Sequence, residues 1–214
     1  MLSTSLRASS LAALALLALA CAPRARPLPG TPVVARLPAA QLPLERQRLD
    51  FRWEFVDGDV SARGDGVARL AGPDSARVDF FLDGGYGGGW AVLIGDRLTT
   101  LNGAGAVKRY LPPTPLLWAT LGRLAVPAAA DTVARRDGDV LRADIGRDPL
   151  WRVTFTGDRL AGLARISGGR IAERVERASD GSASYRNDAA HRSLVLRVTR
   201  SQGGVAFDDQ IWRP

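Results

Sequence analysis

The chain carries few side chains that could do catalytic chemistry, and His191 is its only histidine. A nucleophile activated by histidine needs an imidazole that a hydroxyl and a carboxylate can both reach. Asp188 and Ser193 offer these groups, but both lie too close to His191 in sequence to converge easily on its ring. Because no second histidine or cysteine accompanies it, a zinc site is not expected either. We therefore predict a protein that is not an enzyme, with no catalytic residues, metal or cofactor, and we interpret His191 as a surface-loop residue.

The formal net charge is +7, and almost all of it comes from arginine because Lys108 is the only lysine. The arginines are spread singly among acidic residues rather than gathered in blocks with aromatic side chains. This spread does not favour a nucleic-acid partner. It favours a weak general attraction to anionic surfaces such as membranes or polysaccharides.

Cys21 is the one cysteine, and it follows a short apolar segment. A positive charge precedes the apolar run at 11–20, which is too short to span a bilayer but has the length of a secretory signal core. The sequence Ala-Leu-Ala-Cys at 18–21 resembles the lipobox of bacterial lipoproteins, in which the cysteine becomes the acylated first residue. A single thiol can form no internal disulfide, which also favours lipidation. The alternative is an ordinary signal peptide cut nearby, with Cys21 incidental.

The lipobox resemblance divides the chain into three parts. Residues 1–20 form a signal peptide, residues 21–43 a lipidated, palmitate-bearing cysteine with a tether rich in proline, alanine and arginine, and residues 44–214 the folded domain. Five prolines between positions 22 and 42 favour an extended, semi-rigid tether. Lipoproteins kept at the inner membrane often have aspartate after the cysteine, and here that residue is Ala22. The resemblance therefore implies a lipid anchor in the bacterial cell envelope, at the outer membrane facing the periplasm.

The stretch 76–101 carries the clearest β pattern. Val78, Phe80 and Leu82 alternate with charged residues at 77, 79 and 83, which predicts a strand with one buried face. The apolar run 90–94 is typical of a strand covered on both sides. Between them, a loop at 83–89 places Tyr86 among five glycines. We predict that Tyr86 contacts a membrane or a partner at the loop tip. The alternative is that its ring folds back onto the sheet.

Further strand-like segments fill most of the chain from Leu49 onward, separated by Asp-Gly and Gly-Gly turns. Short strands at this spacing predict an antiparallel meander of about eleven strands, which is too many for a flat open sheet. In the segment 60–70 the apparent inner face is built mostly from small residues, including Gly64 and Gly66. Glycine inside a strand marks a bend or a place where another group approaches the backbone.

One helix interrupts the β pattern near Thr114. Thr114 is suited to cap it and Pro115 to occupy its first position, where a missing N–H costs nothing. Leu117 and Leu121 then share an apolar face, which Trp118 broadens. Because a helix of about two turns is not stable alone, we expect this face to lie on the sheet.

The order of these segments resembles a known family. A first strand is followed by ARGDGVARLAGPDSARVDFFL, a glycine-rich loop, WAVLIGDRLTTL, the leucine- and tryptophan-containing helix and a long β meander. This order is similar to the carriers and outer-membrane receptors of the lipoprotein-localisation (Lol) system, the LolA/LolB-like proteins. The resemblance implies a mainly β fold: a curved antiparallel half-barrel whose concave side is covered by one or more short helices and holds acyl chains. It also implies an exposed hydrophobic residue on a loop between early strands, where this chain has Tyr86.

An acyl-chain cavity needs apolar, concave walls, which aromatic side chains of the strands and apolar side chains of the helix could supply. The predicted ligand-binding residues are Phe51, Trp53, Phe55, Phe80, Trp90, Leu117, Trp118, Leu121, Trp151 and Phe155. The predicted function is that of a lipid-anchored envelope protein that binds an acyl chain or lipoprotein lipid, in lipoprotein localisation or envelope maintenance. In the alternative, these side chains fill a core, and the protein is a structural or partner-binding outer-membrane lipoprotein without a ligand.

Overall fold

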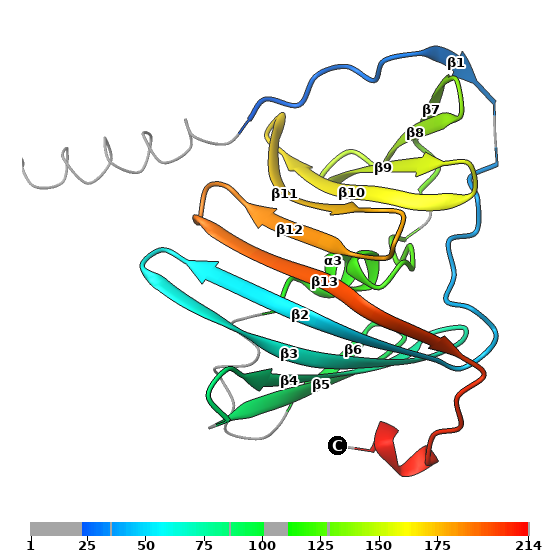
Figure 1. Cartoon of the computed structure of the whole chain (residues 1–214). Helices are drawn as coiled ribbons and strands as arrows, with labels where there is room; N and C mark the ends of the chain where they lie inside the picture. The colour runs from blue at the N-terminus through cyan, green and yellow to red at the C-terminus, as the bar shows by residue number, and fades with distance from the viewer. Residues whose placement is uncertain (1–22, 35, 86, 101–110, 128, 214) are drawn as a thin grey trace, which may run out of the picture.

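The computed structural model describes residues 23–34, 36–85, 87–100, 111–127 and 129–213. These residues form one antiparallel sheet of thirteen strands with a short helix on its concave side (Figure 1). The strands are β1 (Thr31–Val33), β2 (Gln47–Asp57), β3 (Val60–Ala71), β4 (Ser75–Leu82), β5 (Gly88–Ile94), β6 (Arg97–Thr100), β7 (Thr132–Asp137), β8 (Val140–Ile145), β9 (Leu150–Thr156), β10 (Arg159–Ser167), β11 (Arg170–Arg177), β12 (Ala183–Asn187) and β13 (Arg192–Gly203). The helical elements are α3 (Thr114–Thr120) and the 3-10 helix η1 (Asp209–Trp212). Cys21 and Tyr86 lie outside the described residues, as does most of a further candidate strand at 106–111.

Early and late parts of the folded chain meet in the middle of the sheet. The strand order is β1-β7-β8-β9-β10-β11-β12-β13-β2-β3-β4-β5-β6. The pairing of β2 with β13 runs from Gln47 opposite Gly203 to Asp57 opposite Arg192. Strands β1 and β6 stand at the two ends of this order, so the described sheet is curved but not closed. The predicted mainly β, antiparallel half-barrel is therefore confirmed.

The sheet extends into the segment predicted from the sequence to be a tether. Strand β1 pairs with β7, with Thr31 opposite Arg136. Farther along, the backbone N–H of Leu124 donates to the carbonyl of Ala40 at 2.8 Å, and Leu42 is buried in the core. The described part of this segment therefore lies along the domain, which gives it much less reach than a free tether.

Two glycines in β3 let other groups approach its backbone, as their position inside a strand predicts. A Cβ atom added to Gly66 would lie 2.4 Å from Cε2 of Phe51 on the neighbouring strand. One added to Gly64 would lie 1.8 Å from the carbonyl oxygen of Phe81 in β4. Side chains cannot be accommodated at either position, because the Phe51 ring of β2 lies against Gly66 and the backbone of β4 lies against Gly64.

Helix α3 is buried on every side rather than along one face. Its side chains from Leu116 to Thr120 are all buried, and it packs on β10, β11 and β12. The predicted cap at Thr114 is wrong, because Pro113 occupies the N-cap position and no side chain caps the helix. The carbonyl of Pro113 accepts the N–H of Leu117 at 2.9 Å, so helical hydrogen bonding starts one residue earlier than predicted.

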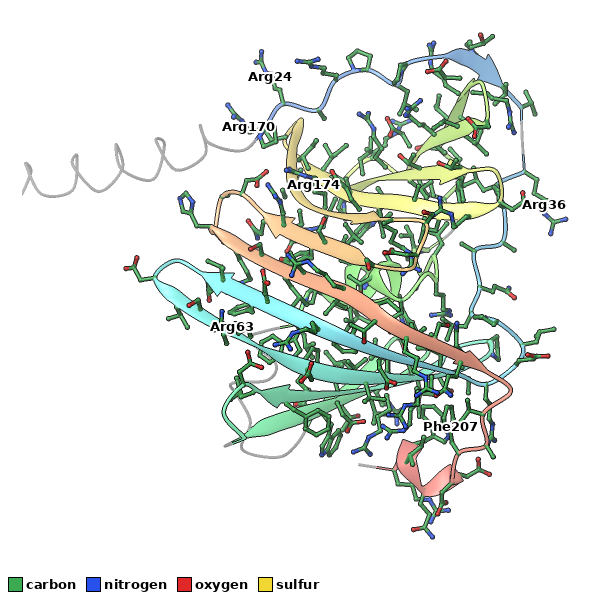
Figure 2. All side chains as sticks on the ribbon, in the orientation of Figure 1. Arg24, Arg36, Arg63, Arg170, Arg174 and Phe207 are labelled. Atoms are coloured by element: carbon green, nitrogen blue, oxygen red, sulfur yellow. The ribbon has the colours of Figure 1, made fainter. Side chains whose placement is uncertain are left out.

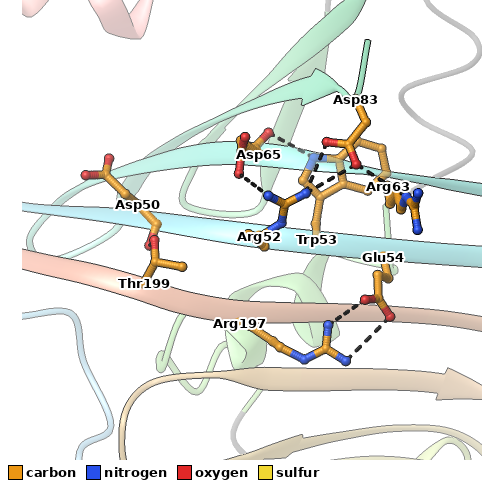
Figure 3. A network of polar contacts seen from close by, with 9 residues as sticks. All are labelled: Asp50, Arg52, Trp53, Glu54, Arg63, Asp65, Asp83, Arg197 and Thr199. Atoms are coloured by element: carbon orange, nitrogen blue, oxygen red, sulfur yellow. Dashed lines mark hydrogen bonds and ion pairs between the residues drawn. The ribbon is translucent and has the colours of Figure 1, made fainter.

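Ion pairs cover the convex face of the central strands (Figure 3). Arg197 of β13 lies 2.7 Å from Glu54 of β2, and Arg52 of β2 lies 3.2 Å from Asp83. The hydrogen bond and the positive charge of Arg197 lower the pKa of Glu54 below its usual value. Such exposed pairs add little stability individually. Because these pairs gather on the convex face, that face is the charged and solvated side of the sheet, and the concave face is the apolar side.

Candidate functional site

Most of the predicted ligand-binding residues lie in the core on the concave side of the sheet. Eight of them are between 0% and 8% exposed: Phe51, Trp53, Phe55, Phe80, Leu117, Trp118, Leu121 and Phe155. Trp90 and Trp151 are half-buried. The structure divides the ten residues into four aromatic residues on β2 and β4, three residues on or directly after α3 (Leu117, Trp118 and Leu121), Phe155 on β9, and the two half-buried tryptophans.

The aromatic side chains of β2 and β4 pack against one another. The Phe80 ring centroid lies 5.9 Å from that of Phe51 and 5.6 Å from that of Trp53, both edge-to-face. This is a favourable geometry for aromatic pairs. The indole N–H of Trp53 donates to the carbonyl of Asp65 at 2.9 Å. The rings therefore form a packed cluster, in which Phe51 lies against Gly66 of β3.

Trp90 belongs to the other face of the sheet. It is paired across β4 and β5 with Asp79, whose neighbour Phe80 is buried on the concave side. Because side chains alternate along a strand, Asp79 and Trp90 point to the convex side. There the Arg77 guanidinium lies 5.1 Å from the Trp90 ring centroid. Trp151 has the same parity in β9 as the buried Phe155 and packs against the concave core.

Trp118 ties α3 to the distant end of the sheet. Its indole N–H donates to the carbonyl of Gly95, in the turn between β5 and β6, at 2.6 Å. Since α3 packs on β10 to β12, this bond connects two parts of the curved sheet across its concave side. Leu117 and Leu121 fill the space between helix and sheet, and both are buried.

The pocket next to the helix lies at the flank of α3, not beneath it. It has a volume of about 430 Å³ and is bounded by the β5–β6 turn, the start of α3 and the chain that follows it. Leu124, Val126 and Pro127 contribute apolar side chains to its lining, Trp118 contributes its indole, and Asp96 contributes a carboxylate. The Arg123 guanidinium lies 4.7 Å from the Trp118 ring centroid and covers the indole. The site therefore combines apolar side chains with one cation, Arg123, and one carboxylate, Asp96.

Of the residues predicted to bind a ligand, this pocket brings in Trp118 alone. Sequence reasoning missed Arg123, Val126 and Pro127, because the segment after the helix has no periodic pattern. A signal was available in the position of Arg123 directly after Gly122, whose φ of +96° ends the helix. A cation a few residues beyond a helix end is placed to fold back over its last turn.

The C-terminal end of α3 is held by a second arginine. A guanidinium N–H of Arg177 in β11 donates to the carbonyl of Thr120. Cations at a helix C-terminus are stabilised by its exposed carbonyl groups. Burial lowers the pKa of Arg177 to about 10, which still leaves the guanidinium charged at neutral pH. Arg177 thus fixes the helix end from which Arg123 and the pocket wall continue.

One polar cluster interrupts the apolar concave face. The buried carboxylate of Glu173 accepts the Tyr185 hydroxyl at 2.8 Å and an Arg165 N–H at 2.7 Å. Burial and the hydrogen bond to Glu173 raise the pKa of Tyr185 above its usual value. The buried polar groups of this cluster therefore find their hydrogen-bond partners within the sheet.

The remaining sequence predictions concern the surface. His191 is exposed in the turn between β12 and β13, with a φ of +52°, as expected for a loop residue. Within the described ranges, no group of three or more histidine, cysteine or acidic residues could hold a metal ion. Nor does any helix in those ranges have the length and apolar character to cross a membrane.

No family model and no curated protein matches the sequence. Solved structures do match. A DUF1329 family protein from Desulfovibrio piger has a TM-score of 0.52 and 7% identity, over 79% of this chain and 90% of that one. A LolA superfamily protein from Nitrosomonas europaea has a TM-score of 0.48 and 10% identity, over 82% of this chain and 93% of that one. The likeness to LolA-type proteins expected from the sequence thus appears among the structural matches. At identities this low, likeness concerns the fold alone.

Proposed function

We propose that this protein is a lipid-anchored protein of the bacterial envelope that binds an acyl chain with an anionic end in the pocket at the flank of α3. The observation that carries the proposal is the combination of apolar walls at Leu124, Val126 and Pro127 with the guanidinium of Arg123. Small-molecule sites are mostly apolar, with a few polar groups that fix orientation. The lipobox resemblance at Cys21 supports the anchor and the place in the envelope.

The pocket size is suitable for one chain. Its volume of about 430 Å³ falls within the range of roughly 300–1,000 Å³ that is usual for ligand pockets. In this proposal the chain lies along Leu124 and Val126, and its anionic end pairs with Arg123. Arg123 then leaves the Trp118 ring, and the ligand covers the indole in its place.

The direct test uses the chain from Ala22 onward, which keeps every described residue. We expect it to bind a fluorescent fatty acid, with binding followed by fluorescence titration. Val126→Glu should weaken binding by about tenfold or more, because a charge would be buried in the apolar wall. The matched control is Val133→Glu on β7, where the side chain is 58% exposed, and it should leave binding unchanged.

Arg123→Gln distinguishes the contribution of the ligand's anionic end from that of its apolar chain. It should weaken binding of a fatty acid by up to about fivefold, as for an exposed ion pair, and leave binding of the matching fatty alcohol unchanged. Equal loss for both ligands would mean that Arg123 contributes apolar contact rather than charge.

A second candidate function is a structural or partner-binding lipoprotein with a filled interior. The edge-to-face packing of Phe80 with Phe51 and Trp53 favours it, because these rings pack against one another on the concave side of β2 and β4. Failure of the chain to bind any acyl probe, together with a Val126→Glu variant of unchanged stability, would select this candidate.

A further inference from the structure

The first described residues are hydrogen bonded to the turn between β10 and β11. The N–H of Ala25 donates to the carbonyl of Gly169 at 2.9 Å, and the N–H of Ile171 donates to the carbonyl of Pro23 at 2.9 Å. Arg24 thereby forms an antiparallel bridge with Arg170. In Figure 1 the start of the described chain, in dark blue, lies beside the tip of this hairpin. The chain is therefore fixed to one corner of the sheet from Pro23 onward.

This attachment sets the distance between the domain and a lipid on Cys21. Two peptide units separate Cys21 from Pro23, so their Cα atoms are at most about 7.6 Å apart. A free chain from 22 to 42 could instead extend to about 70 Å. A lipid on Cys21 therefore brings the β10–β11 turn to the membrane surface instead of letting the domain move far from it.

The same corner has the charge that an anionic bilayer attracts. Arg24 and Arg26 are exposed, and the sequence has no acidic residue between positions 22 and 44. Arg170 lies beside Arg24, whereas Arg36 lies on the far side of the molecule (Figure 2). The turn itself is formed by Gly168 and Gly169, so no bulky side chain keeps its backbone away from headgroups.

We propose that Arg24, Arg26 and the β10–β11 turn form the membrane-facing surface of the protein and contact anionic phospholipid headgroups. This inference rests on the lipid anchor at Cys21 and is independent of the acyl-chain pocket. By strand direction, the loop between β4 and β5 leaves the sheet at the same end as this turn. The proposal therefore also places the two ends of the Tyr86 loop on the membrane side.

The orientation is tested with the lipidated full chain in phosphatidylglycerol-containing vesicles. Because Cys21 carries the lipid, an introduced cysteine is the only free thiol for a fluorescent label. Ser167→Cys labels the exposed end of β10, and Ser201→Cys labels an exposed site on β13 at the opposite end of the sheet. Quenching by spin-labelled headgroups should be strong at position 167 and weak at 201. Equal quenching at both positions, or the reverse order, would overturn the proposal.

The charge contribution is tested in the same vesicles. Docked protein is here the protein whose label at position 167 is quenched by the headgroups. Each of Arg24→Gln and Arg26→Gln should lower the ratio of docked to undocked protein by about fivefold, and this loss should disappear in purely zwitterionic vesicles. Arg36→Gln is the matched control and should change nothing. If all three variants behave alike, the surface is not the one proposed.

Lipidation of Cys21, on which this inference rests, is tested separately by mass spectrometry. If the mass of the mature protein shows no acyl chains on Cys21, the orientation proposal fails at its first step. Fatty-acid binding by the chain from Ala22 onward would be unaffected by that result. Conversely, loss of the acyl pocket would leave the quenching pattern intact.

Discussion

Gly66 and Phe51 are opposed across β2 and β3, and the ring of Phe51 occupies the space that a side chain at position 66 would need. The distance from a Cβ built on Gly66 to Cε2 of Phe51 is 2.4 Å. The absence of a side chain in one strand thus allows an aromatic ring of its neighbour to lie close to the backbone. The edge-to-face contacts of Phe80 depend on that position.

Gly66→Ala should therefore destabilise the protein by about 1–3 kcal/mol, because the new methyl group would displace a packed ring. Urea unfolding followed by circular dichroism measures the change. Gly203→Ala is the control, since a Cβ there would meet an exposed Glu45 carboxylate at 3.4 Å, and it should change stability by less than about 0.5 kcal/mol. Equal effects of the two substitutions would refute the role of Phe51.

Trp118→Phe should lower stability by about 1–3 kcal/mol, because it leaves the Gly95 carbonyl without the indole donor and removes buried volume. Unfolding in urea again gives the magnitude. Trp151→Phe changes a tryptophan that is only half-buried, and we expect a smaller loss. If Trp118→Phe were neutral, the bond between α3 and the β5–β6 turn would not hold the two parts of the sheet together.

The raised pKa of Tyr185 predicts that the protein loses stability at alkaline pH. Its pKa is raised in the folded protein by burial and by Glu173, whereas in the unfolded chain it titrates near the ordinary value of about 10. As the pH rises through that value, the unfolded state loses the phenolic proton first. Its contribution to stability is therefore complete below about pH 10 and declines above it.

The measurement is the free energy of unfolding between pH 8 and the alkaline limit of folding, compared between the native chain and Tyr185→Phe. The variant should be less stable at pH 8, because Glu173 loses a donor, and its stability should decline less above about pH 10. Parallel curves would show that Tyr185 has no raised pKa.

Tyr86→Asp should weaken association of the protein with liposomes without changing its melting temperature, if Tyr86 is the contact point at the loop tip. Flotation of the chain from Ala22 onward with liposomes measures the first quantity, and a thermal scan measures the second. Phe81→Asp on β4, where the phenylalanine is 52% exposed, serves as a comparison for any exposed aromatic side chain. Unchanged flotation of the Tyr86 variant would remove it from the membrane surface.

The sequence predicted most strands closely, because alternation and Gly-containing turns are local signals. The strands at 140–145 and 170–177, for example, begin at or just after the Asp-Gly turn at 137–138 and the Gly-Gly turn at 168–169. Strand β1 was not predictable, since its three residues include Pro32, which is acceptable only because the strand lies at the sheet edge. Its pairing depends on β7, about a hundred residues away.

The candidate site was harder to predict for two physical reasons. Trp90 stands in an unbroken apolar run, and such a run gives no indication of which side chains face the concave side. The wall formed by Val126 and Pro127 belongs to an irregular segment that is positioned by hydrogen bonds at its start, including that from Leu124 to Ala40. Contacts of this kind depend on the fold as a whole.

The pairing of β2 with β13 also has a consequence for how the chain reaches its native state. The strands β2 to β6 and β7 to β13 are two runs of neighbouring hairpins, each of which needs only local loop closure. The central pairing of Gln47 with Gly203 instead joins positions near the two ends of the domain. Folding rates fall as contacts become more distant in sequence. The two runs of hairpins should therefore form early, and the pairing of β2 with β13 that joins them should form last.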